Sequence, residues 1–218
     1  MKLTAKLFLL AGIFFTACQS APKADEAATA EKQEAAAATG TAFTVDTTTS
    51  IVTWAGTKPT ATHTGTFKIK EGKIAVDKNT LTGGSFVIDI ASLIDIDLTG
   101  EFKGKLEGHL KSPDFFDVAK FPVAKFEITK VEPFDSTKQK SLLPGATHLL
   151  SGNLTLKDST KNVTFPAIIN VTDNALTAQA NFNIDRTEWG MNYKGPDNPQ
   201  DWVIKKEVNL QLNVKAGK

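Results

Sequence analysis

The strongest constraint on the fold of this chain is an alternation of apolar and polar residues with a period of two. The clearest case is residues 176–184, where apolar residues at the even positions alternate with Thr, Gln and Asn at the odd positions. Such a segment has one dry and one wet face, which is typical of a β-strand half buried in an antiparallel sheet. An amphipathic helix would instead need its apolar residues three or four positions apart.

The same alternation recurs from about residue 42 onward and predicts eight or nine strands, separated by turn-forming pairs such as Lys157-Asp158 and Asp173-Asn174. Strands with one apolar face and short connections indicate an all-β fold in which an antiparallel sheet curls into a sandwich or barrel. A doubly wound α/β fold would need continuously apolar strands and repeated helices. The expected strands include residues 51–57, 67–69, 73–76, 86–90, 126–128, 150–156, 163–171, 176–184 and 208–214.

One interior segment, residues 98–120, departs from this alternation. It places Phe102, Leu106 and Leu110 at helical spacing, and Pro113 ends the helix or starts a new turn. We therefore expect one short helix that covers an end of the barrel.

The N-terminus has the features of an export leader. Lys2 and Lys6 precede an apolar stretch of 11 residues at 7–17, which is too short to cross a bilayer as a helix. Cys18 follows as the single cysteine, and residues 15–18 resemble a bacterial lipobox, with Phe where Leu is usual. These features predict a lipoprotein signal peptide at 1–17, an acylated Cys18 as membrane anchor, and a place in the bacterial cell envelope on the outer-membrane or periplasmic side. A plain secretory signal is the alternative.

The segment that follows predicts a tether. Between Cys18 and residue 41 the chain consists mostly of Ala, Glu, Lys and Thr, and residues 19–40 contain no aromatic or large aliphatic side chain. Such a composition buries too little apolar surface to offset the entropy of ordering the chain. We therefore expect a flexible tether at 18–41 and a folded domain at 42–218.

Charge and motifs exclude several classes of function. The 25 basic and 24 acidic residues leave no net charge that would attract nucleic acid, so no nucleic-acid partner is expected. The chain has no nucleophile elbow, no zinc-protease motif and no phosphate loop. His63, His109 and His148 lie at least 39 residues apart, so we expect neither a metal site nor a cofactor.

The ten residues that end at Asp117 concentrate polar and aromatic groups, with His109, Asp114 and the adjacent Phe115 and Phe116. Three interpretations are open. His109 could act as an acid or base with one of the two carboxylates, the segment could be a capped turn that plugs its aromatic rings into the core, or it could line and close a cavity.

Arg186 is the only arginine among the 25 basic residues. A chain that otherwise uses lysine indicates that this position needs a planar, permanently charged, bidentate group. Pairing with a neighbouring acid and stacking on Trp189 is one interpretation, and contact with the polar head of a ligand is the other.

Several blocks of the sequence resemble the YceI-like family of bacterial envelope proteins and run in the family's order across about residues 43–214. The resemblance implies a lipocalin-like, eight-stranded antiparallel barrel whose apolar interior holds a polyisoprenoid or similar amphiphile without catalysis. A barrel of eight strands leaves room for side chains or one small ligand. The matching blocks are residues 54–58, 63–65, 83–89, 108–117, 121–126, 151–156, 161–166 and 182–190.

On this basis we expect a carrier, buffer or sensor of isoprenoid or long-chain lipids. The polar residues expected near the mouth of the barrel are His63, His109 and Arg186. The apolar residues expected in the cavity wall are Trp54, Phe67, Phe86, Phe102, Leu106, Phe115, Phe116, Phe121, Phe126, Phe165, Phe182 and Trp189.

Two alternatives belong to other classes of function. One is a lipid-modifying enzyme that uses His109 with Asp117, or His63, as acid and base. The other is an adhesion or scaffold module whose barrel is packed solid. The oligomeric state is open, and a homodimer is one of the options.

Overall fold

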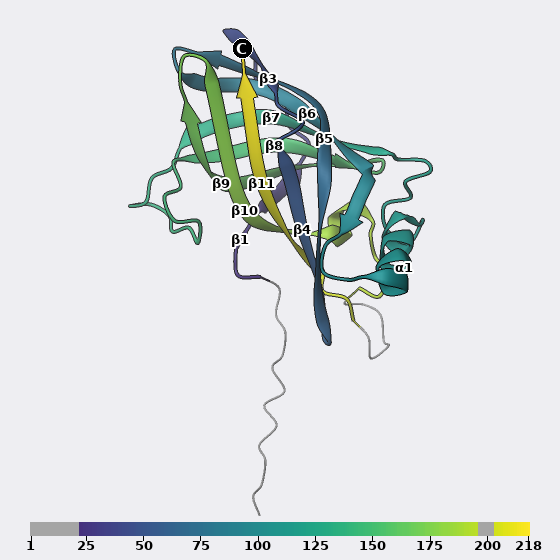
Figure 1. The fold of residues 1–218 in the computed structure, drawn as a ribbon. Helices are drawn as coiled ribbons and strands as arrows, with labels where there is room; N and C mark the ends of the chain where they lie inside the picture. Colours follow the sequence, from purple (N-terminus) through teal and green to yellow (C-terminus); the bar gives the residue numbers. More distant parts are fainter. Residues whose placement is uncertain (1–21, 196–202) are drawn as a thin grey trace, which may run out of the picture.

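The computed structural model describes residues 22–195 and 203–218, so the predicted leader and the predicted anchor, Cys18, lie outside the described residues. Eight antiparallel strands close into a barrel, because the first, β4, pairs with the last, β11, as well as with β5 (Figure 1). The predicted eight-stranded antiparallel barrel is therefore confirmed. Its strands are β4 (Ile51–Lys58), β5 (Ala61–Asp77), β6 (Thr80–Asp95), β7 (Val123–Pro133), β8 (His148–Leu156), β9 (Ser159–Val171), β10 (Ala175–Asp185) and β11 (Glu207–Gly217).

β5 and β6 are much longer than the sequence pattern suggests. The segment 73–76, expected as a separate strand, is the second part of the 17-residue β5, which reaches it across register shifts near Thr66 and Ile69. This part of β5 pairs with an additional strand, β3 (Thr41–Val45), which also contacts the end of β11. The register shifts bend β5 and β6, so each of these long strands reaches from one end of the barrel to the other.

The interior of the barrel is packed solid along part of its length. Phe165 and Phe182 stack with their ring centroids 3.8 Å apart, Phe126 lies 5.9 Å from Phe165, and Phe86 lies 5.3 Å from Phe126. All four rings are buried in the hydrophobic core, as is Phe43 of β3. None of these five rings is among the residues that line the cavity described below, and we call the cluster that they form the packed section of the barrel.

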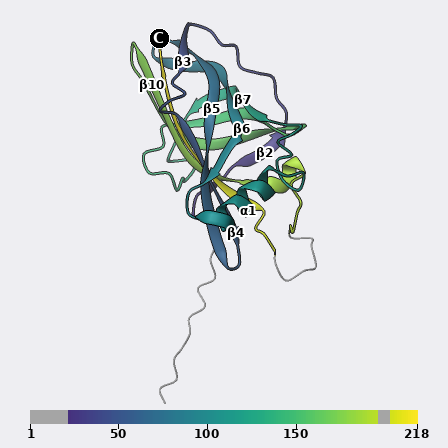
Figure 2. The ribbon, with the colours of Figure 1, turned by 45° about the vertical axis from the view of Figure 1, so that its right-hand side comes forward.

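The helix α1 (Gly100–Lys111) lies at the end of the barrel opposite the C-terminus, as Figures 1 and 2 show. Leu106 and Leu110 pack against the core, but Phe102 is 73% exposed. Phe102 stands in the first turn of the helix, so only the later turns that carry Leu106 and Leu110 pack against the core, and the expected shared face does not include Phe102. Among the residues that the structure describes, no helix is long and apolar enough to cross a membrane.

The segment expected as a flexible tether is instead part of the fold from Pro22 onward. β1 (Asp25–Glu26) pairs in parallel with β10, and β2 (Ala28–Glu31) pairs with β9. These strands occupy the gap that opens where β9 and β10 stop pairing, beyond Ala167 and Ala180. We call residues 22–40 the N-terminal strap.

Side chains of the barrel hold the strap where its own backbone lacks a neighbouring strand. The amide of Asn153 accepts a hydrogen bond from the backbone N–H of Gln33 (3.0 Å) and donates one to its carbonyl (2.8 Å). The N–H of Ala36 bonds the carbonyl of Ile128 farther along. The composition correctly indicates that the strap buries few large side chains, but pairing with open strand edges needs only backbone groups.

Replacing Asn153 by Ala should lower the free energy of unfolding by about 1–3 kcal/mol, because a buried amide that satisfies two backbone groups of the strap is lost. Denaturant unfolding measures this change. Gln33→Ala is the matched control, since Asn153 uses only the backbone of Gln33, and it should change the stability little. Equal effects of the two substitutions would contradict this account.

Candidate functional site

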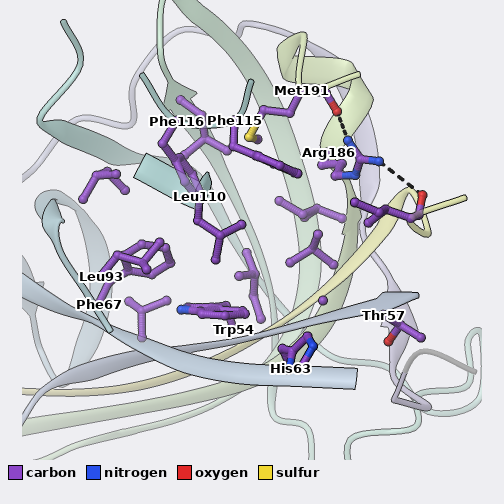
Figure 3. Close-up of a pocket in the computed structure, with 18 of the residues that line it drawn as sticks. Trp54, Thr57, His63, Phe67, Leu93, Leu110, Phe115, Phe116, Arg186 and Met191 are labelled. Carbon is purple, nitrogen blue, oxygen red and sulfur yellow. Dashed lines mark hydrogen bonds between the residues drawn. The ribbon is translucent and has the colours of Figure 1, made fainter. Parts of the chain in front are cut away.

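The hollow section of the barrel is an apolar cavity of about 250 Å³ beneath α1. It extends between β4, β5, β6, β8, β10 and β11, and α1 with the turn that follows it closes the end (Figure 3). The residues that line it are Val52, Trp54, Gly56, Thr57, Lys58, His63, Phe67, Ile88, Ile90, Leu93, Leu106, His109, Leu110, Phe115, Phe116, Leu154, Leu156, Ile184, Arg186, Met191, Ile204, Lys205, Val208 and Leu210.

The turn after α1 carries two aromatic rings to the cavity. The N–H of Phe116 bonds the carbonyl of Leu110, and the N–H groups of Phe115 and Asp117 both bond the carbonyl of Ser112. This bonding reverses the chain tightly after Pro113. Phe116 then meets Phe67 of β5 edge to face, with centroids 5.5 Å apart. Of the three interpretations of this segment, its place in the structure fits closure of a cavity.

His109 contacts two aromatic rings that also contact each other. Its ring centroid is 5.1 Å from that of Phe115 and 4.7 Å from that of Tyr193, both edge to face. Its Nε2 lies 3.0 Å from the Oδ2 of Asp114. Asp117 pairs instead with Lys120 at 3.3 Å, so the structure does not bring together the expected acid–base pair of His109 and Asp117. The reason is local, because the tight turn points the two carboxylates apart.

Arg186 is buried and bonds backbone carbonyls. It follows β10 in the short 3-10 helix η1 (Arg186–Trp189), and its side chain is 2% exposed. Nε donates to the carbonyl of Lys205 (3.1 Å), Nη2 to those of Tyr193 (3.0 Å) and Ile204 (3.2 Å), and Nη1 to that of Met191 (Figure 3). The guanidinium therefore ties the segments on either side of residues 196–202 together.

Neither interpretation of Arg186 from the sequence describes these contacts. The guanidinium carbon of Arg186 lies 5.7 Å from the ring centroid of Phe115 in a cation–π contact. The expected partner, Trp189, instead donates its Nε1–H to the carbonyl of Leu154. The neighbouring Asp185 pairs with Lys206 at 2.8 Å. Hydrogen bonds from Lys206 and Thr187 outweigh the effect of burial and lower the pKa of Asp185. Arg186 lines the cavity mainly as a fixed positive charge.

Of the expected site residues, the structure brings together at the cavity Trp54, Phe67, Leu106, Phe115, Phe116, His63, His109 and Arg186. The others lie elsewhere. Phe86, Phe126, Phe165 and Phe182 form the packed section, Trp189 is buried behind Leu154, Phe102 is exposed, and Phe121 is half-buried away from the lining. His148 also lies away from the cavity, beside Thr147, and burial lowers its pKa.

The sequence analysis missed the aliphatic part of the lining, which includes Leu93, Leu156, Met191 and Leu210. Alternation does mark most of these side chains as inward-facing. It does not report the height of a residue along the barrel axis, which decides whether an inward side chain meets the cavity or the packed section. Strand register carries that information, and it is a property of the folded barrel.

Comparisons with known proteins identify a family match and solved structures that have this architecture. A family model described as the YceI-like domain matches residues 43–216. None of the curated proteins compared with the chain matches it. Several solved structures share the fold.

The crystal structure of BcnA from Burkholderia cenocepacia is 20% identical, with a TM-score of 0.58 over 78% of this chain and 98% of its own. A domain from Saccharophagus degradans, described as a polyisoprenoid binding domain implicated in plant cell wall breakdown, is 16% identical, with a TM-score of 0.58 over 80% and 97%. A YCEI protein from Campylobacter jejuni is 20% identical, with a TM-score of 0.51 over 67% and 80%. At these identities the likeness shows the fold alone.

The family match covers every strand of the barrel, the helix and the turn that closes the cavity. It leaves out residues 1–42, and with them the whole N-terminal strap. From this match and the closed eight-stranded barrel, the chain belongs to the YceI-like family.

Proposed function

We propose that the protein binds an isoprenoid or another long-chain amphiphilic lipid in the cavity and acts as a lipid carrier, buffer or sensor in the cell envelope, without catalysis. The observation that carries this proposal is the apolar cavity of about 250 Å³ between the barrel wall and the turn of Phe115 and Phe116. The Saccharophagus degradans domain of the same fold, described as polyisoprenoid-binding, supports it. Apolar pockets with a few polar groups are the usual form of small-molecule sites.

The polar part of the lining favours an acidic head group. Lys58, His63, His109, Arg186 and Lys205 line the cavity together, and no Asp or Glu is among the described residues that do so. A phosphate or carboxylate head would therefore lie in a positive field. Because Arg186 already donates to four carbonyls, Lys58 and Lys205 are the better candidates for direct contact.

The size of the cavity constrains how such a lipid binds. Small-molecule pockets commonly measure roughly 300–1,000 Å³, so this cavity holds a short chain or one end of a longer one. About ten buried methylenes contribute on the order of 8 kcal/mol, which lies within the association cost of about 4–15 kcal/mol. Tight binding of a long chain therefore requires the cavity to enlarge, and the turn that carries Phe115 and Phe116 is the element we expect to move.

The proposed anchor would keep the barrel close to a membrane. If Cys18 is acylated, only residues 19–23 separate it from Ala24, which is buried, and from β1. An extended chain spans at most about 3.3–3.6 Å per residue, so these steps reach about 20 Å. A barrel held at this distance could exchange its ligand with the membrane that carries it.

The first test is native mass spectrometry with organic extraction of protein purified from a bacterial host. The protein must keep residues 22–40, because the strap is part of the barrel. We expect one copurifying amphiphile per chain, or uptake of one added isoprenoid phosphate, and recovery of that lipid with unchanged mass. A clean apo mass with no uptake would refute lipid binding, and a changed mass would refute the absence of catalysis.

A further inference from the structure

A cluster of two carboxylates and one imidazole lies beside the cavity, where β6 ends and β5 begins. It consists of Asp95, the last residue of β6, Asp97 and His63 of β5. One potential ligand atom from each lies within 4.8 Å of the other two. The histidine spacing in the sequence predicts no metal site, but the fold supplies carboxylates as partners for His63.

Asp95 is the unusual member of this cluster because it is completely buried and incompletely satisfied. Its exposed fraction is 0%. Its Oδ1 accepts the N–H groups of Asp97 (3.2 Å) and Leu98 (2.6 Å), whereas its Oδ2 has no hydrogen-bond partner among the described residues. Buried carboxylate oxygens are normally paired, so this oxygen calls for a bound cation or for a proton shared with Asp97.

The surroundings of Asp95 add negative charge. Asp97 accepts hydrogen bonds from the backbone N–H of Thr64 (2.6 Å) and lies 3.0 Å from Nδ1 of His63. Glu107 of α1 accepts the backbone N–H of Asp95 and pairs with Lys103 at 3.8 Å. Among the described residues, His63 and Lys103 are the partners of these three acids within 4.0 Å.

The pKa values respond to this crowding. Burial raises the pKa of Asp95, and the adjacent carboxylate of Asp97 raises it further against the hydrogen bond from Leu98. For Asp97, burial also acts upward, but the hydrogen bonds from Thr64 and His63 prevail and lower its pKa.

We propose that His63, Asp95 and Asp97 form a binding site for a divalent transition-metal cation of the Zn²⁺ or Mn²⁺ type. Two ligand atoms about 2.1 Å from such an ion, at tetrahedral or octahedral angles, lie roughly 3.0–3.4 Å apart. The 3.0 Å between Nδ1 of His63 and Oδ2 of Asp97, which is their hydrogen-bond distance without an ion, already lies in this range. An imidazole among carboxylates favours these ions over Ca²⁺ and Mg²⁺, which prefer oxygen ligands alone.

An ion at this site would connect elements that frame the cavity. His63 belongs to the cavity lining, and Asp95 is bonded to Glu107 of α1, the helix that covers the opening. The ion would therefore join the barrel wall to the segment that leads into this helix. Three protein ligands leave at least one coordination position for water or another small ligand.

Isothermal titration calorimetry on the purified, EDTA-treated protein with ZnCl₂, MnCl₂ and CaCl₂ tests the proposal, after alkylation has blocked any free thiol at Cys18. We expect one equivalent of Zn²⁺ or Mn²⁺ to bind with micromolar or higher affinity and Ca²⁺ to bind more weakly. Asp95→Asn and Asp97→Asn should each weaken binding by about 100-fold or more. Asp97 is partly exposed, so its variant carries the test if Asp95→Asn does not fold.

Asp114→Asn is the matched control. Asp114 also pairs with a histidine at 3.0 Å, but among the described residues no third, buried carboxylate accompanies this pair, so the affinity should not change. If none of the three ions binds, the proposal is overturned, and a proton shared with Asp97 is then what satisfies Asp95. Binding that survives both Asn variants, or tighter binding of Ca²⁺ than of Zn²⁺ and Mn²⁺, would overturn it as well.

Discussion

Filling the cavity with two larger side chains, Ile90→Phe together with Val208→Phe, should weaken lipid uptake by about 100-fold while the protein stays folded. Both residues line the cavity, so the added rings occupy space that the ligand needs. Exclusion of about four methylenes at about 0.8 kcal/mol each corresponds to roughly 3 kcal/mol, or about two orders of magnitude in affinity. Titration with an isoprenoid phosphate, followed by fluorescence or native mass spectrometry, measures the loss.

The same kind of substitution in the packed section provides the control. Ile128 is as buried as Ile90, at 3% exposure, but it does not line the cavity. Ile128→Phe should cost about 1–3 kcal/mol of stability through overpacking, with little effect on the lipid affinity of the folded fraction. Wild-type uptake by the folded double variant would show that the lipid binds elsewhere.

Loss of the Arg186 side chain should lower the free energy of unfolding by about 3–5 kcal/mol. Arg186→Ala removes a buried cation that donates to four backbone carbonyls and leaves these acceptors without a partner in a buried site. Such a loss is a large fraction of the roughly 5–15 kcal/mol that stabilises a typical domain. Chemical denaturation, followed through tryptophan fluorescence, would report it.

Two variants distinguish the contribution of the guanidinium's hydrogen-bonding geometry from that of its positive charge. Arg186→Lys keeps the charge but cannot reach carbonyls on both sides at once, so we expect a substantial part of the loss to remain. Lys206→Ala removes the exposed pair with Asp185 next to it and should cost no more than about 1 kcal/mol. A loss below this value for Arg186→Ala would mean that the side chain is available to a ligand rather than committed to the fold.

The sequence was least informative where backbone groups, and not side chains, form the contacts. The strap has few apolar side chains, so its composition predicts a tether. In the folded barrel, however, β1 and β2 pair with the edges of β10 and β9, which become available where these two strands no longer pair with each other. Likewise, the sequence marks Arg186 as exceptional, but its partners are the carbonyls of Met191, Tyr193, Ile204 and Lys205, which no side-chain pattern can identify.

Local motifs correctly indicated which residues are unusual, but not which side chains interact with each other. The segment around His109 correctly indicates a special turn near the opening of the barrel. Which carboxylate meets the imidazole depends on the tight turn after Pro113, which places Asp114 beside His109 and Asp117 beside Lys120. The His63 cluster shows the converse, since residues 32 and 34 positions away become its neighbours through the pairing of β5 with β6.

The sequence by itself determined the all-β class, the eight or nine antiparallel strands, one short helix at an end of the barrel and most of the side chains that face inward, because these follow from the period of the apolar pattern and its interruptions. Only the tertiary structure decided where the interior is hollow, that Phe126, Phe165 and Phe182 fill one section while Leu93 and Met191 line another, and that the strap completes the wall. The physical reason is that alternation fixes the direction of a side chain, whereas its height in the barrel and its neighbours depend on strand register, which is set by the closure of the whole sheet.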